Sequence, residues 1–271
     1  MNTSVKVILC CALLALRPLS GLTETINFNA TNWPDTNWEV RVRTTPLVTI
    51  TNIQNQTWLQ MGRTDANNGS AQLVYTGGDS NAASAVNQLG DITGRVVLAT
   101  SNNDTSYGFG LALRAENRTW LSEFAPEYYL AIVTSSNTNL PYRGLALTWA
   151  VSYNFFSALT NPPPVLLAAS PASIAFETLR ASAGNNKKYL LEFSVIGYQF
   201  NAALWKLDTN DQKNTLMAEL SYYDDREELR RKNGWFALRA GRMGGSSQAY
   251  FREASLEVLP ETPHGTIISI K

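Results

Sequence analysis

The segment that decides the fold is Tyr107-Gly-Phe-Gly-Leu-Ala-Leu-Arg-Ala115. Its three large apolar side chains occupy every second position: Phe109, Leu111 and Leu113. Alternate side chains of an extended strand point to opposite faces, so these three share one face. The other face carries small residues and Arg114. Such alternation predicts a half-buried β-strand, and residues 145–153 repeat the pattern.

Outward from this segment, short apolar-periodic runs alternate with turns rich in Asn, Thr, Gly and Ser. This pattern is typical of an all-β sandwich. Further strands are predicted at 71–75, 94–100, 127–133, 188–197, 199–207, 215–221, 234–240 and 249–258. Helical periodicity is scarce, and only the charged run Asp224 to Lys232 predicts a short surface helix.

The amino-acid composition excludes several classes of function. The chain has 271 residues, 44% of them apolar, with 22 basic and 22 acidic side chains. It is long enough to bury a large core, and its balanced charge argues against nucleic-acid binding. The single histidine, His264, and two cysteines near the N-terminus leave no material for a zinc site. A catalytic triad would depend on that one histidine, close to the C-terminus.

The N-terminus predicts export. Lys6 precedes a ten-residue apolar run from Val7 to Leu16, which is well short of the roughly 20 residues that span a bilayer. We therefore expect a signal peptide at 1–22, a single domain at 23–260 and a tail at 261–271. The mature protein would be secreted or periplasmic, without a membrane span, and would carry 20 basic and 22 acidic residues, a charge of −2.

The second half contains a recognisable order of strands. Lys188 to Gly197 is followed by Phe200 to Leu207, then by Gly234 to Gly241 and Ala249 to Val258. This order resembles the C-terminal part of laminin-G-like and concanavalin-A-like jelly-roll domains, and Tyr107 to Val133 resembles an earlier block of the same families. The resemblance covers roughly 90–258. It implies a two-sheet antiparallel jelly-roll sandwich, and it brings glycan-binding modules, glycoside hydrolases and polysaccharide lyases as function classes.

Catalytic patterns of these classes are weak. Hydrolases of this fold carry a Glu-x-Asp-x-x-Glu strand, which this sequence lacks. Glu253 and Glu257 share one face of a predicted strand, but we expect this face to be exposed to solvent. A lyase would need a histidine or a tyrosine with arginine partners, and His264 lies in a Pro-His-Gly tail. The sequence therefore favours a binding function over a catalytic one.

Two arginines occur in the same four-residue sequence, Ala-Leu-Arg-Ala, at 112–115 and 237–240. Strand alternation places both Arg114 and Arg239 opposite the core leucines, and Gly108, Gly110 and Ala112 leave room beside Arg114. Guanidinium groups bind hydroxyls and carboxylates well, so both arginines are candidate ligand contacts. The alternative is an ion pair across the sheet. Trp120 and Tyr142 are expected at the rim of the same site.

The other tryptophans and the turns offer less specific signals. Trp33, Trp38 and Trp58 lie in the polar opening segment, where they either stack on sugars or cap the sandwich. Oxygen-rich turns at 64–69, 101–104 and 208–211 leave calcium as an open alternative, although such turns are common without metal. Otherwise we expect no cofactor.

These observations predict an exported, all-β, concanavalin-A-like sandwich that binds a polysaccharide or glycoconjugate without catalysis. Two alternatives stay open: a polysaccharide-active enzyme of the same fold, and a structural or adhesive protein.

Overall fold

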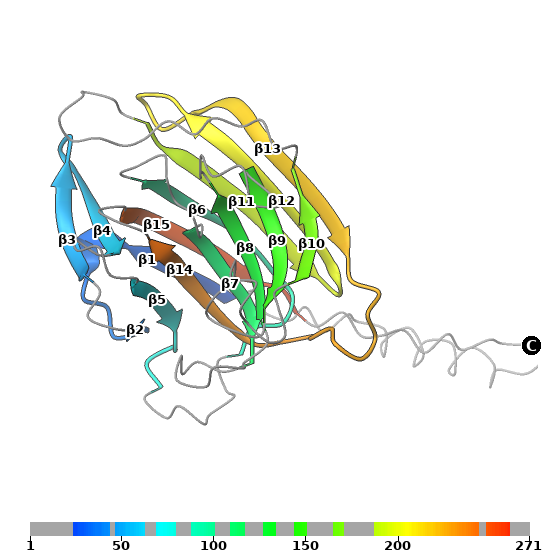
Figure 1. Ribbon diagram of the computed structural model, residues 1–271. Coiled ribbons are helices and arrows are strands. Elements are labelled where there is room, and N and C mark those ends of the chain that lie inside the picture. Colours follow the sequence, from blue (N-terminus) through cyan, green and yellow to red (C-terminus); the bar gives the residue numbers. More distant parts are fainter. Residues whose placement is uncertain are drawn as a thin grey trace, which may run out of the picture.

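The chain folds in the computed structural model into two antiparallel β-sheets packed face to face (Figure 1). The structure describes residues 24–43, 47–62, 69–79, 88–100, 109–116, 127–133, 144–150, 165–170, 187–243 and 248–260. The predicted signal peptide and the tail at 261–271 lie outside these ranges, so both stay predictions.

Sheet A contains β1 (Glu24–Asn29), β3 (Leu47–Ile53), β4 (Gln56–Gly62), β6 (Ile92–Thr100), β11 (Tyr189–Ile196), β12 (Gln199–Leu207), β13 (Lys213–Tyr223) and β15 (Gln248–Val258). Its order is β13-β12-β11-β6-β15-β4-β3, with β1 also paired to β15. A single 3-10 turn, Ala30–Asn32, follows β1 in the described part of the chain.

Sheet B contains β2 (Trp38–Arg43), β5 (Gly69–Tyr75), β7 (Phe109–Ala115), β8 (Glu127–Val133), β9 (Gly144–Ala150), β10 (Val165–Ala169) and β14 (Trp235–Met243). Its order is β10-β9-β8-β7-β14-β5-β2. The edge strands β10 and β13 lie side by side at one edge of the sandwich (Figure 1).

The core lies between the sheets and confirms the predicted alternation. Phe109, Leu111 and Leu113 of β7 are buried there, facing residues such as Leu191 and Leu256 of sheet A. All ten predicted strands are present, with ends that shift by a few residues. The strands at 24–29, 38–43, 47–53, 56–62 and 165–169 were not individually predicted. Polar residues interrupt the apolar pattern of segments such as ETINFN, whereas VLLAA at 165–169 is a continuous apolar run without alternation.

The predicted helix at 224–232 is wrong. This segment is a turn that links sheet A to sheet B. Asp224 is fully buried, where it accepts a hydrogen bond from the Tyr128 hydroxyl (2.6 Å) and two from the Arg226 guanidinium (2.8 Å each). The tertiary hydrogen bond from Tyr128 and the local hydrogen bonds from Arg226 hold Asp224 in a turn, and together they outweigh the weak helix propensity of a charged run.

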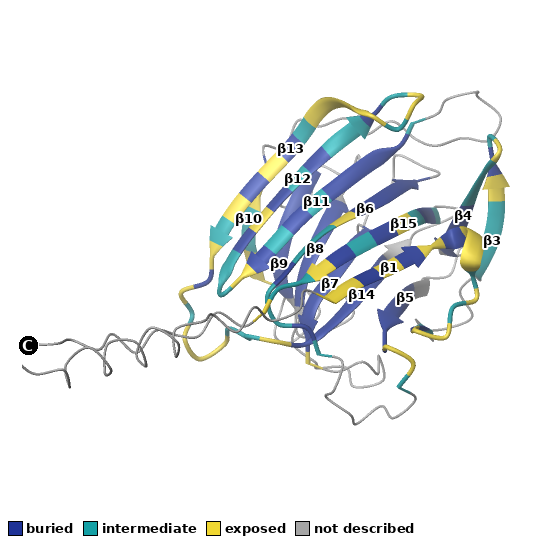
Figure 2. Cartoon of the chain, turned by 180° about the vertical axis from the view of Figure 1, so that it is seen from behind, coloured by how far each residue is buried: buried dark blue, intermediate teal, exposed yellow. Residues whose placement is uncertain are grey.

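The outer faces of the two sheets differ. On sheet B, Ala112, Tyr129 and Thr148 point away from the core, yet each is completely buried. On sheet A, exposed and half-buried residues alternate with buried ones along β12 and β13 (Figure 2). The open surface therefore belongs to the outer face of β11, β12 and β13.

Candidate functional site

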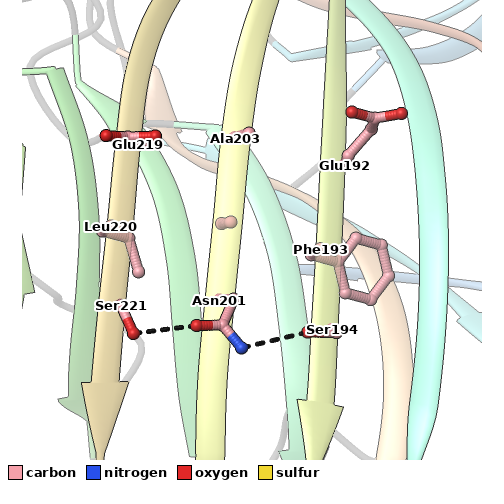
Figure 3. A pocket seen from close by; sticks show the side chains of 9 residues that line it. Glu192, Phe193, Ser194, Asn201, Ala203, Glu219, Leu220 and Ser221 are labelled. Atoms are coloured by element: carbon pink, nitrogen blue, oxygen red, sulfur yellow. Dashed lines mark hydrogen bonds between the residues drawn. The ribbon is translucent and has the colours of Figure 1, made fainter.

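The three strands of this open surface form a meander whose register aligns polar side chains in rows. Ser194 of β11 pairs with Asn201 of β12, which pairs with Ser221 of β13. One step along, Glu192, Ala203 and Glu219 form a second row. Directly opposed residues of an antiparallel sheet share a face, so both rows point outward together (Figure 3).

The first row is a hydrogen-bonded ladder. Asn201 Nδ2 donates to Ser194 Oγ (3.3 Å), and Ser221 Oγ donates to Asn201 Oδ1 (2.8 Å). Gln199 extends the ladder, because its Nε2 donates to Ser221 Oγ (2.8 Å). Asn201 and Ser221 remain exposed. The ladder therefore holds donors and acceptors in fixed positions at the surface.

The second row creates a hollow. Ala203 is small and half-buried, and it lies between the longer Glu192 and Glu219 (Figure 3). With the ladder, this row lines a groove of about 700 Å³. That size falls within the roughly 300–1,000 Å³ of sites that hold small ligands.

The groove has a different residue type at each end. Near the turn between β11 and β12, Ile196 and Tyr223 flank Gln199 and are 45% and 57% exposed. At the other end, the Lys213 ammonium lies 5.0 Å from the centre of the Trp205 ring and forms an ion pair with Glu192 (2.6 Å). An exposed aromatic ring thus lies beside the ladder at one end, and an ion pair crosses the groove at the other.

This chemistry suits a ligand rich in hydroxyl groups. A hydroxyl both donates and accepts, and the ladder supplies serine, asparagine and glutamine groups that do the same, while the carboxylates only accept. Glu192 and Glu219 lie two strand spacings apart, roughly 10 Å between Cα atoms, and Glu192 is held by Lys213.

The structure places Arg114 elsewhere. Its side chain is 2% exposed and lies at the end of the sandwich, where Nη1 donates to the carbonyls of Gly197 (2.5 Å) and Arg231 (2.8 Å). Its Nη2 donates to the Gly90 carbonyl (3.3 Å) and pairs with Asp91 (3.1 Å). Burial lowers the pKa of Arg114, and the negative charge of Asp91 opposes that shift. The ion-pair alternative therefore describes its environment.

The expectation that Arg114 shares a face with Arg239 is wrong. Between Ala112↔Ala237 and Ala115↔Trp235, β7 has one residue more than β14, and Arg114 has a positive φ of 50°. This β-bulge turns Arg114 to the side of Leu113, toward sheet A. Strand alternation alone cannot reveal a bulge, because the extra residue leaves no mark in the hydrophobic pattern.

Arg239 lies on the outer face, as expected. It pairs with Gly110 and stands 5.0 Å from the centre of the Tyr129 ring. It is 1% exposed, and burial lowers its pKa well below the usual value. The structure thus does not bring the two arginines together. Trp120 and Tyr142 lie outside the described residues, and the ligand-binding roles of all four residues stay predictions.

Two tryptophans of the opening segment lie in strands, and Trp33 follows the 3-10 turn. Trp38 of β2 and Trp58 of β4 are buried, and Trp33 packs partly against the core. The alternative that they stabilise the sandwich is therefore the better one. Glu253 and Glu257 are exposed on β15, in agreement with the solvated face expected for them.

The side-chain oxygens of the turn at 208–211 form hydrogen bonds and ion pairs with other groups of the protein. Asp208 Oδ1 accepts the backbone N–H groups of Asn210 and Gln212 (2.8 Å each), and Asp211 pairs with Lys188 and Arg252. Within the described residues, no group of three or more His, Cys, Asp or Glu side chains is arranged to hold a metal. Residues 64–68 and 101–104 lie outside the described ranges.

The groove residues were not singled out by their sequence. The alternation in Gln199-Phe-Asn-Ala-Ala-Leu-Trp205 places Gln199 and Asn201 on one face, which is a detectable signal. Their alignment with Ser194 and Ser221 depends on strand register, which only the folded sheet provides.

Comparisons with known proteins agree with this architecture. No known protein family matches the sequence, and no curated protein is similar to it. Similar solved structures include the exoplasmic/lumenal domain of VIP36 in its Ca²⁺/Man3GlcNAc-bound form, with a TM-score of 0.50 and 13% identity over 88% of this chain and 90% of that one. The sandwich has a concanavalin-A-like architecture.

Two further solved structures match the chain with lower TM-scores. Peanut lectin bound to a nine-residue peptide gives a TM-score of 0.47 at 13% identity, over 89% of this chain and 100% of that one. The carbohydrate-binding module CBM66 from Bacillus subtilis gives 0.39 at 15% identity, over 80% and 92%. The two-sheet antiparallel topology and the match to the VIP36 domain confirm the concanavalin-A-like part of the predicted resemblance, whereas the laminin-G part stays a prediction. Within the described residues, no helix is long and apolar enough to cross a membrane.

Proposed function

We propose that this protein is exported and binds glycans without catalysing their turnover, through the groove on the outer face of β11, β12 and β13. The observation that carries the proposal is the exposed ladder of Ser194, Asn201, Ser221 and Gln199 beside the exposed ring of Tyr223. Sugars present hydroxyl edges and C–H faces, so a ladder of amides and hydroxyls next to an aromatic ring matches both.

The fold and the sequence support the same function. The VIP36 domain with this architecture was solved with a mannose-containing glycan bound, although 13% identity transfers only the fold. Export rests on Lys6 and on the apolar run of residues 7–16, which is too short to span a bilayer. A polysaccharide or glycoconjugate outside the cytoplasm is therefore the partner that we propose.

A glycan array probed with residues 23–271 tests the proposal, followed by titration of the best ligand. Asn201→Ala should weaken binding by about 1 kcal/mol, or roughly fivefold, because it removes the centre of the ladder. Tyr223→Ala should also weaken it, through loss of the stacking surface.

Asn52→Ala is the matched control. Asn52 is an exposed asparagine of β3, at the opposite edge of sheet A, with a side-chain hydrogen bond to Thr57 (3.1 Å). It should bind as the unchanged protein does. Equal losses in Asn201→Ala and Asn52→Ala, or no binding to any glycan on the array, would contradict the proposal.

A further inference from the structure

One end of the groove is closed by a single side chain. Lys213 lies opposite Leu207, at the start of β13, and its side chain reaches across β12 to Glu192 on β11. Its ammonium is 2.7 Å from Glu192 Oε2 and 5.0 Å from the centre of the Trp205 ring beneath it. The ion pair therefore bridges the two flanking strands over the middle one.

The opposite end is open. Beyond the residues that line the groove, the next outward-facing row of these strands contains Ile196, Gln199 and Tyr223. Ile196 and Tyr223 are among the most exposed large apolar side chains of the described residues. A ligand chain can leave the groove over this end, with the Tyr223 ring available as a contact surface. The two ends thus impose a direction on an elongated ligand.

The length between the ends limits what the groove can hold. Ala203 and Gln199 are four residues apart on β12, which corresponds to roughly 13 Å at the rise of a strand. Together with a volume of about 700 Å³, this leaves room for about two or three sugar units before a chain extends beyond Tyr223.

The charges of the groove are unequal. Lys213 neutralises Glu192, whereas Glu219 is exposed on the edge strand and forms no ion pair with a described residue. An ionised carboxylate only accepts hydrogen bonds. Glu219 can therefore accept from a sugar hydroxyl, and it repels a carboxylate or sulfate on the ligand.

We infer that the groove recognises the end of an uncharged glycan chain, which abuts the Lys213–Glu192 bridge and leaves over Tyr223, while Glu219 rejects acidic sugars. This inference rests on the proposed function and adds the class of ligand and its direction of binding.

Calorimetric titration with linear glucose and mannose oligosaccharides of one to six units tests the closed end. For a series that binds, Kd should fall about tenfold or more from one to three units and change less than about twofold from three to six. Lys213→Ala removes the bridge, so the hexamer should then bind at least about threefold tighter than the trimer. Lys213→Arg keeps the ion pair and should behave as the unchanged protein does.

Hexamers oxidised to carboxylates at C6 test the charge. They should bind about tenfold more weakly than the neutral hexamers, and Glu219→Gln should reduce that difference to about threefold or less. Glu228→Gln removes an equally exposed carboxylate on the segment that links β13 to β14 and should leave the difference unchanged.

Each result decides between the two proposals. A Kd that keeps falling up to six units in the unchanged protein, or oxidised hexamers that bind as well as neutral ones, overturns the inference and leaves glycan binding in place. Failure of every glycan, in both the array and the titrations, overturns the proposed function and the inference with it.

Discussion

Arg114 and Arg239 occur in the same four-residue sequence, Ala-Leu-Arg-Ala, in neighbouring strands. Their side chains nevertheless point to opposite faces of sheet B. Arg114 turns inward at a β-bulge and contacts three carbonyls and Asp91. Arg239 stays in regular register on the outer face of sheet B, against the Tyr129 ring. Both are almost completely buried.

The contrast shows that the free-energy cost of burying a charged side chain depends on the groups that surround it. At Arg114, hydrogen bonds join β7 to the loop before β6, the turn between β11 and β12 and the segment before β14. Arg114 thus ties four separate parts of the chain at one end of the sandwich. At Arg239, burial lowers the pKa well below its usual value, because desolvation disfavours the charged guanidinium.

The largest expected effect comes from Arg114→Met. This change leaves Asp91 with the Gly197 N–H (2.9 Å) as its remaining hydrogen-bond donor, and it should destabilise the fold by about 3–5 kcal/mol. Arg239→Met keeps an apolar group of similar length beside Tyr129 and removes a desolvated cation, so it should cost less than Arg114→Met. Urea unfolding of both variants measures the difference.

Glycan titration of the same two variants sharpens the comparison. Both should bind as the unchanged protein does, because neither arginine lines the groove. If Arg114→Met lost affinity while its midpoint of unfolding stayed the same, Arg114 would instead be a ligand contact, as the sequence first suggested.

The bulge itself can be tested through Gly234. A Cβ at this position would lie 2.3 Å from the carbonyl carbon and 2.6 Å from the Cα of Arg114. Gly234→Ala should therefore displace the bulge and cost about 1–3 kcal/mol. Gly90, whose carbonyl accepts from Arg114, has open space at its Cβ position, and Gly90→Ala should be close to neutral. Thermal melting of the pair checks this, and equal losses would contradict the close packing of Gly234 on Arg114.

A third buried cation, Lys188, should make the stability of the fold depend on pH. It pairs with Asp211 beside Arg252, and burial together with the positive charge of Arg252 lowers its pKa from 10.5 to about 8. Between these two values the unfolded chain holds a proton that the folded chain has released, so stability should rise with pH from about 8 to 10.

Lys188→Met should remove this rise, whereas Lys213→Met, at an exposed lysine of β13, should keep it. The pH range over which stability rises ends near pH 10. Burial and the hydrogen bond to Asp224 raise the pKa of Tyr128 in the folded protein. Above pH 10 this tyrosine therefore ionises more readily in the unfolded chain, which favours unfolding. Melting temperatures measured from pH 7 to 10 test the prediction. A rise that persists in Lys188→Met would assign it to another group.

The sequence by itself determined the strands, the sandwich and the apolar faces. Segments such as Phe109 to Leu113 alternate so regularly that only an extended strand buries them together. The alternation also predicted the outward position of Arg239 and of the exposed Glu253 and Glu257. These are local properties, because a period of two depends only on neighbouring residues.

Only the tertiary structure decided where polar groups find partners. A bulge turned Arg114 inward, a buried Asp224 converted an expected helix into a turn, and strand register aligned Ser194, Asn201 and Ser221 into one ladder. The hydrogen-bond partners of Arg114, the partner of Asp224 at Tyr128 and the partner of Asn201 at Ser221 all lie 20 or more residues away in the sequence. Hydrogen bonds and ion pairs are specific to position, whereas hydrophobic burial follows a local period, so the sequence predicts the core and the fold decides the site.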